Sequence, residues 1–263
     1  MTTDTLATVT SKDGTKLAVH VTGAGPAVVL VSGGSVDRGS NAGLAAVLAP
    51  DFTVYNYDRR GRGESGDTLP YTVGREIEDI EAVIGLAGGH AHLYGSSSGA
   101  GLALEAAAAG ASVDRLVLWE PPYNLDPAGR PPADSVEQLD RMVADGRRGD
   151  AAEFFMTQMV RLPAEFVAFA RTQPWWAAQE AIAHTLAYDA RVMGDYSVPT
   201  ATAGRVTVPT TILTGGASFD LFKPTAEALA AAMPDADVKV LEGQEHNVDP
   251  AVLGPAMKEF LLG

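Results

Sequence analysis

Short apolar runs alternate with stretches of helical periodicity along most of the chain. Residues 27–31 are continuously apolar and lead into a glycine-rich loop, which is typical of a strand buried on both faces of a sheet. Residues 73–86 instead carry four aliphatic side chains at helical spacing. Similar patterns predict further strands over 6–10, 16–21, 52–57, 92–94, 116–119, 211–213 and 238–241, and further helices over 44–48, 100–109, 224–233 and 252–262. This alternation predicts an α/β fold with a mostly parallel sheet covered by helices on both faces.

One segment, about residues 121–199, interrupts the alternation. It has helical patterns over 136–147, 151–161, 164–171 and 175–193, no convincing strand, and proline-rich flanks. Such a segment either completes the fold as a helical excursion or forms a lid over a site. We favour the lid, because ligands of open α/β sheets bind outside the carboxyl ends of the strands. The expected organisation is a core domain of residues 1–120 and 200–263 with a helical cap of residues 121–199.

Composition and charge narrow the possible partners. The 263 residues include no cysteine, which excludes a thiol nucleophile, and 33 acidic against 19 basic side chains give a formal net charge of −14. A field of that sign repels phosphate backbones and anionic lipids, so neither nucleic acid nor a membrane is an expected partner. The first residues lack a secretory signal, and no apolar run approaches the ~20 residues of a membrane helix. We expect a cytoplasmic monomer or homodimer that acts on a small molecule.

The motif Gly95-Ser96-Ser97-Ser98-Gly99 lies between a predicted strand and a predicted helix. This is the context of the G-x-S-x-G nucleophile elbow, in which a sharp turn holds the central hydroxyl out at the top of the sheet. The glycines remove side chains that would clash where strand and helix approach each other. A chance glycine- and serine-rich turn is the alternative. We expect Ser97 to be a nucleophile.

A serine hydroxyl needs an adjacent base, and the sequence offers five histidines. His246 alone lies in a loop after the last predicted strand, where its ring can reach the carboxyl edge of the sheet. The base in turn needs a carboxylate that fixes its tautomer. Asp220, between Ser97 and His246 in the chain, gives the order Ser, Asp, His that is typical of the elbow architecture. Its rival is Glu120, directly after strand 116–119, and we favour Asp220.

The oxyanion of the reaction needs backbone donors. The N–H of Ser98, at a helix start, is one candidate. The loop Ser32-Gly33-Gly34-Ser35 supplies the other, from Gly34 or alternatively from Ser35.

Two further motifs carry a family resemblance. The run Asp58-Arg59-Arg60-Gly61-Arg62-Gly63-Glu64-Ser65 resembles the D-x-R-G-x-G-x-S turn of many α/β hydrolases, and residues 208–215 resemble the run into their acid-bearing loop. With the elbow, they make the whole chain similar to the α/β-hydrolase superfamily, in its serine-nucleophile, esterase- and lipase-like branch. The resemblance implies an eight-stranded sheet, a helical cap, no cofactor or metal, and the triad Ser97, Asp220 and His246. It also implies that Arg59 and Arg60 brace loops rather than bind an anion.

The chain departs from the family pattern at three places. Ser32-Gly33 replaces a common His-Gly pair, Asp220 lies four rather than three residues after the loop glycine Gly216, and Glu245 precedes the histidine where glycine is frequent. The first departure leaves the backbone donor intact but changes what orders the oxyanion loop.

The substrate site is expected to involve large apolar side chains, because pockets are mostly apolar. We assign substrate contacts to Ser35, Tyr123, Trp175 and Trp176, although adjacent tryptophans on a helix cannot both face one way.

The sequence therefore predicts a serine hydrolase of a small, neutral, fairly hydrophobic carboxylic ester, thioester or lactone. Alternatives with the same triad are a cofactor-free haloperoxidase, a carbon–carbon bond hydrolase or an acyltransferase. A small-molecule receptor with little turnover is an alternative of another class. Epoxide hydrolases and haloalkane dehalogenases are disfavoured, because those relatives carry Asp where Ser97 stands.

Overall fold

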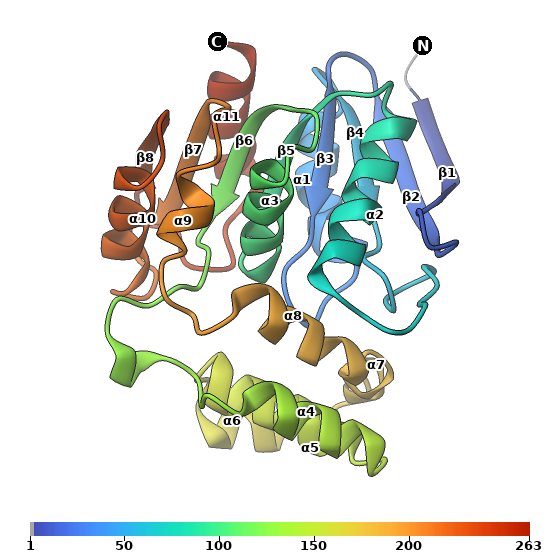
Figure 1. The fold of residues 1–263 in the computed structure, drawn as a ribbon, viewed down its shortest axis with the longest axis vertical. Coiled ribbons are helices and arrows are strands. Elements are labelled where there is room, and N and C mark those ends of the chain that lie inside the picture. The colour runs from blue at the N-terminus through green and yellow to red at the C-terminus, as the bar shows by residue number, and fades with distance from the viewer. Residues whose placement is uncertain (1–2) are drawn as a thin grey trace.

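A single sheet of eight strands runs through the computed structural model, which describes residues 3–263, in the order β1-β2-β4-β3-β5-β6-β7-β8 (Figure 1). The strands are β1 Thr3–Thr10, β2 Lys16–Gly23, β3 Ala27–Val31, β4 Thr53–Tyr57, β5 Ala91–Ser96, β6 Val113–Trp119, β7 Thr210–Gly215 and β8 Ala236–Leu241. β2 pairs antiparallel with both β1 and β4, and all other pairs are parallel. The predicted mostly parallel sheet and its eight strands are confirmed.

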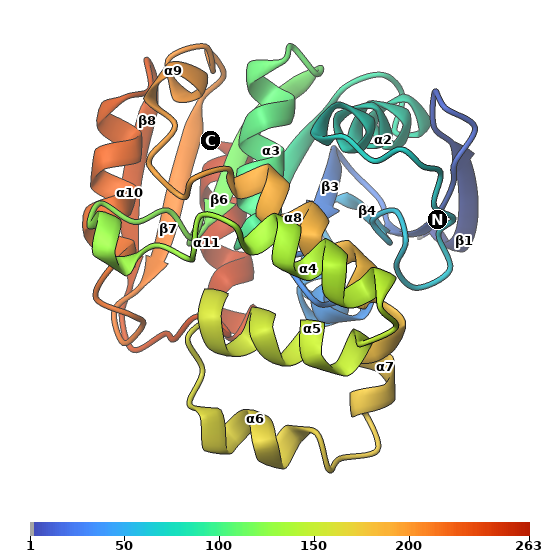
Figure 2. The same cartoon turned by 60° about the horizontal axis from the view of Figure 1, so that its bottom comes forward.

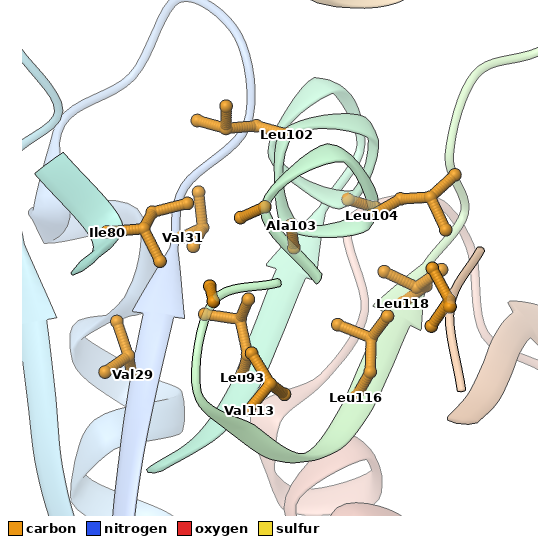
Figure 3. Packing of buried hydrophobic residues seen from close by; sticks show 14 of the residues in the cluster. Val29, Val31, Ile80, Leu93, Leu102, Ala103, Leu104, Val113, Leu116 and Leu118 are labelled. Carbon is orange, nitrogen blue, oxygen red and sulfur yellow. The ribbon is translucent and has the colours of Figure 1, made fainter. Parts of the chain in front are cut away.

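Helices cover both faces of this sheet. The face toward the viewer in Figure 1 carries α2 Val73–Leu86, α3 Ser98–Ala108, α10 Phe222–Ala231 and the short α9 Thr200–Ala203, and α1 Ala42–Leu48 and α11 Pro250–Leu262 lie behind. Figure 3 shows side chains such as Val29, Leu93 and Leu116 of the sheet packed against Ile80 of α2 and Ala103 of α3. A second cluster, which includes Leu30, Leu48 and Met257, fills the space on the other face. No helix within residues 3–263 has the length and apolar character to cross a membrane.

The segment 121–199 is helical, as its patterns predict. Its helices are α4 Ser135–Ala144, α5 Arg148–Phe154, a π-helix Phe155–Met159, α6 Ala164–Ala170, α7 Trp176–Ala181 and α8 Leu186–Met193. Short 3₁₀ turns cover Arg38–Asn41, Pro127–Gly129 and Ala183–Thr185. Figures 1 and 2 show α4 to α7 beyond one edge of the sheet, with α8 between them and the core. These helices share a third hydrophobic cluster, which includes Leu139, Phe155 and Leu186.

The predicted helix over 175–193 is broken into α7, a 3₁₀ turn and α8. Ile182 leaves the helical conformation with φ −101° and ψ 6°. The carbonyl groups of Glu180 and Ala181 accept hydrogen bonds from the Arg148 guanidinium. Because a side chain satisfies these last carbonyls, the helix can end there. Periodicity alone does not reveal such a long-range contact.

Register brings the expected functional positions to one edge. Ser96 of β5 pairs with Trp119 of β6, and Trp119 pairs with Leu213 of β7. The residues that follow these three positions therefore stand in a row near the carboxyl ends of neighbouring strands, on the side where α4 to α8 lie.

Candidate active site

Ser97 occupies a strained turn between β5 and α3. Its backbone has φ 54° and ψ −125°, an uncommon conformation for a residue with a side chain. A Cβ atom at Gly95 would lie 2.3 Å from the carbonyl oxygen of Gly99, and one at Gly99 would lie 2.4 Å from that of Ser32. The turn is therefore possible only with glycine at both positions, and the expected elbow is present in its geometry.

His246 is held by contacts on several sides. Its Nδ1 lies 2.6 Å from Oε2 of Glu120. The Phe222 ring stacks on the imidazole with centroids 4.9 Å apart, and the indole N–H of Trp119 donates to the His246 carbonyl oxygen at 2.9 Å. Because an ionised carboxylate only accepts hydrogen bonds, Nδ1 carries the proton and Nε2 is left as the basic atom.

Glu120 is the buried carboxylate of this pair. It is only 1% exposed, and its backbone has φ 43° directly after β6. Besides the imidazole, its oxygens accept hydrogen bonds from the Thr214 hydroxyl, the Gly215 N–H and the Ser218 hydroxyl, at 2.7–3.1 Å. Neutral donors thus satisfy the charge, and the carboxylate has a fixed position against His246.

The preference for Asp220 as the partner of His246 was wrong. Asp220 is exposed, and the Nδ1 atom that it was expected to bind is occupied by Glu120. Both acids follow a strand at the carboxyl edge, but β6 lies nearer the elbow than β7 does. The left-handed turn at Glu120 places its side chain within reach of the ring.

Ser97 and His246 line the same cavity. Within residues 3–263 no direct hydrogen bond joins the Ser97 hydroxyl to the imidazole. Such contacts are frequently looser in structures without a bound substrate than in the reacting complex.

The oxyanion loop packs directly on the elbow. A Cβ atom at Gly33 would lie 3.2 Å from that of Ser97. Arg62 Nη1 donates to the Gly33 carbonyl at 2.6 Å, and Arg59 Nη1 donates to the Ser32 carbonyl at 3.3 Å. Because C=O and N–H of a trans peptide point in opposite directions, the N–H of Gly34 points away from Arg62. Gly34 and Ser98 both line the cavity, and the Ser98 N–H lies in the first turn of α3, where it has no intrahelical acceptor.

A buried ionic network lies beneath this loop. Asp189 of α8 accepts from Arg59 and Arg62 at 2.7 Å each and from the Ser98 hydroxyl at 2.9 Å, and all four side chains are buried. Burial alone would raise the pKa of the Asp189 carboxyl, but Arg62 and Arg59 hold that pKa below its usual range. Guanidinium groups therefore order the loop in which Ser32 replaces the familiar histidine.

The same network explains the neighbouring arginines. Arg59 also binds Glu76 through two hydrogen bonds of 2.7 and 2.8 Å, and Arg60 binds Asp79 through two of 2.7 Å. These contacts support the interpretation of this turn as a brace. The role of Asp189 was missed, and its only sequence signal is a lone acid within the apolar helical stretch 186–193.

The cavity has a volume of about 400 Å³ and a mostly apolar lining. Its walls include Leu44, Phe155, Met159, Met193, Tyr196, Phe219, Phe222 and Leu253. Residues of the core and of the segment 121–199 thus enclose it together.

None of the four assigned substrate contacts is among the described residues that line this cavity. Tyr123 and Trp176 are buried in two different hydrophobic clusters. Trp175 is 47% exposed, and the Ser35 hydroxyl binds Gln179. One tryptophan is exposed and the other is buried, as expected for adjacent residues at a helix, whose side chains point in different directions. Within the described chain, no group of three or more histidine or acidic side chains is arranged to hold a metal ion.

Comparisons with known proteins agree with this geometry. A model of the alpha/beta hydrolase family matches residues 28–255. The crystal structure of an alpha/beta hydrolase from Sphaerobacter thermophilus DSM 20745 is 49% identical, covers 97% of this chain and 100% of that one, and has a TM-score of 0.91.

More distant proteins share the fold. An esterase from Thermogutta terrifontis is 24% identical over 98% of both chains, with a TM-score of 0.74. The 2-hydroxy-6-oxo-6-phenylhexa-2,4-dienoate hydrolase from Rhodococcus sp. strain RHA1 is 21% identical over 99% of this chain and 100% of that one, with a TM-score of 0.69. The uncharacterized hydrolase YraK of Bacillus subtilis (strain 168) is 33% identical over 96 residues, and this match spans only 35% of either chain.

Proposed function

The chain belongs to the alpha/beta hydrolase family, and on that premise we propose that it is a serine hydrolase of small, fairly hydrophobic carboxylic esters, thioesters or lactones. The observation that carries the proposal is the His246–Glu120 pair, whose imidazole lines the same cavity as the strained Ser97. A base with a fixed tautomer beside a hydroxyl on an elbow is the arrangement that acyl transfer requires. We take Glu120 as the acid of the triad.

The proposed reaction has two halves. Nε2 of His246 removes the proton from Ser97 as Oγ attacks the carbonyl carbon, and the resulting oxyanion accepts from the N–H groups of Gly34 and Ser98. The imidazolium then protonates the leaving alkoxide or thiolate, which departs and leaves an ester on Ser97. A water molecule, deprotonated by His246, repeats the sequence and releases the acid. Glu120 stabilises the imidazolium in both halves.

The cavity supports the substrate class. Its volume of about 400 Å³ lies within the range of roughly 300–1,000 Å³ for small-molecule sites, and apolar side chains dominate its walls. We further propose that residues 121–199 act as a cap on the core 1–120 and 200–263. This division is supported by the hydrophobic cluster within the segment and by the cavity residues Phe155, Met159 and Tyr196.

Labelling of the nucleophile tests the proposal. The parent protein is treated with a fluorophosphonate and, separately, with p-nitrophenyl esters of rising chain length, and the adducts are read by intact mass. We expect one adduct per chain, loss of the adduct and of turnover in Ser97→Ala, and no change in Ser112→Ala. Ser112 is an exposed serine at the opposite end of the sheet, just before β6, and is a matched control.

Two results would contradict the proposal. A Ser97→Ala protein that keeps the parent rate would exclude Ser97 as the nucleophile. A folded parent protein that neither forms an adduct nor turns over any ester would favour a small-molecule receptor instead.

A further inference from the structure

The outer wall of the cavity is built by an irregular stretch of backbone. α5 ends in the π-helix Phe155–Met159, and Phe155, Met159, Val160 and Arg161 all line the cavity. π-helical turns are rare overall, and those that do occur are often located at functional sites. Arg161 follows with φ 63°, in the left-handed region that a residue with a side chain seldom adopts. The local backbone thus departs from regular helix where it presents these side chains to the cavity.

Two side chains on the described cavity wall carry a permanent charge, and only one of them has an ionic partner. These two are Asp189 and Arg161, and the other titratable groups of the lining are His246, Tyr94 and Tyr196. Asp189 is matched by two guanidinium groups, and His246 is matched by Glu120. Within residues 3–263, the Arg161 side chain forms hydrogen bonds only with the carbonyl oxygens of Ala128 and Arg130, each at the long distance of 3.4 Å, and no acidic side chain forms an ion pair with it.

Arg161 has no acidic partner although the chain is rich in acidic side chains. Acidic side chains outnumber basic ones by 33 to 19, so an arginine that lines a cavity without an acidic partner is not the result of a shortage of acids. The planar guanidinium matches a carboxylate through two parallel hydrogen bonds.

We propose that Arg161 binds a carboxylate on the substrate, so that the substrate is an ester, thioester or lactone with an acid group remote from the scissile bond. This inference rests on the proposed hydrolase function and names the substrate class of the same site. One unmatched cation balances one negative charge, which favours a carboxylate over a phosphate dianion in a chain of net charge −14. The expectation of a neutral substrate came from that overall charge and from the aromatic residues of the cap, and neither describes the charges on the wall of the cavity.

Paired substrates test the inference. In the acyl series, p-nitrophenyl monoesters of dicarboxylic acids with four to eight carbons are each compared with their methyl esters. In the alcohol series, acyl esters of 4-hydroxybenzoate are compared with those of methyl 4-hydroxybenzoate. The readout is the ratio of kcat/KM for the acid form to kcat/KM for the methyl-ester form, after subtraction of the uncatalysed rate.

We expect the parent to prefer the acid form in at least one series. Arg161→Gln should lower the ratio roughly tenfold, since hydrogen bonds between charged groups are the stronger ones, whereas the exposure of this arginine limits the effect. Arg161→Lys keeps the charge but not the planar guanidinium, and its ratio should lie between those of the parent and of Arg161→Gln. Arg205→Gln makes the same charge change at an exposed arginine outside the cavity lining and should leave the ratio unchanged.

The outcomes separate the two proposals. If acyl-enzyme forms but Arg161→Gln leaves the ratio unchanged in both series, or the parent prefers the methyl esters throughout, the carboxylate site is refuted and the hydrolase stands. If no ester of either form acylates Ser97, the hydrolase proposal itself fails.

Discussion

Two carboxylates lie close to the elbow, and each is only 1% exposed. Glu120 accepts hydrogen bonds from two hydroxyl groups, one backbone N–H and the ring of His246. Asp189 accepts from two guanidinium groups and the hydroxyl of Ser98. The two carboxylates are equally buried and both lie near the elbow, but their hydrogen-bond partners differ.

The partners decide what each carboxylate can do. Guanidinium groups stay charged throughout the accessible pH range, so the charge of Asp189 is balanced before any reaction begins. In the proposed reaction, Glu120 gains a full countercharge only when His246 becomes an imidazolium, which is the step at which stabilisation is needed. We therefore assign chemistry to Glu120 and the support of the oxyanion loop to Asp189.

The largest effect is expected at Glu120. Glu120→Gln keeps the shape of the side chain but cannot stabilise the imidazolium, and kcat should fall about 10⁴-fold while the protein stays folded. Steady-state kinetics with a p-nitrophenyl ester and circular dichroism measure the two properties.

Asp220→Asn is the control for this variant. It removes the same charge from an exposed position, and its kcat/KM should stay within about twofold of the parent, as for most exposed substitutions. If Asp220→Asn were the inactive variant and Glu120→Gln the active one, the assignment of the acid would be reversed.

The second effect is expected on stability at Asp189. Asp189→Asn leaves Arg59 and Arg62 with one carboxylate fewer in a buried setting, which typically costs about 3–5 kcal/mol. The melting temperature should fall by roughly 10 °C. Calorimetry measures this shift, and Asp220→Asn should melt with the parent. Equal stability of Asp189→Asn and the parent would show that the network does not support the fold.

The smallest effect is expected in acid. The pKa of Asp189 is lower in the folded chain than in the unfolded one, because Arg62 and Arg59 outweigh the opposing effect of its burial. The stabilisation is therefore complete above the unfolded value of about 3.9 and is lost as the pH falls through the folded value. Urea unfolding between pH 7 and pH 3 measures the free energy of unfolding of the parent and of Asp189→Asn. The difference between these two free energies should shrink below about pH 4. A difference that stays constant over this range would contradict the linkage.

The sequence allowed much of the fold to be predicted. The strand Ala27–Val31 and the helix Val73–Leu86 match their expected bounds, since an unbroken apolar run and a helical repeat are local signals. The places of Ser97 after β5 and of His246 after β8 were predictable for a related reason, because they follow from the order of the elements.

The acid partner of His246, the cavity lining and the ionic network depend on the directions that side chains take in the folded chain, which local sequence patterns do not specify. Glu120 and Asp220 both follow strands, and what separates them is the place of β6 next to β5 in the sheet and the φ of 43° at Glu120. Trp176 was assigned to the substrate because of its size and Tyr123 because it follows Glu120 closely, yet both side chains fill hydrophobic clusters. Asp189 meets Arg59 across 130 positions of sequence, and no local pattern encodes that pairing.

The helical segment begins directly after Glu120 and leads back to the core through α8. It is therefore anchored at its start by Glu120, which binds His246, and near its end by Asp189, which lies beneath the oxyanion loop. In the proposed enzyme the first anchor belongs to the triad and the last supports the oxyanion loop, whereas no residue of α4, α5, α6 or α7 is among the described residues that line the cavity. The sequence of these four helices can therefore vary without replacing a lining residue, while a change that displaces α8 would disturb the proposed oxyanion loop.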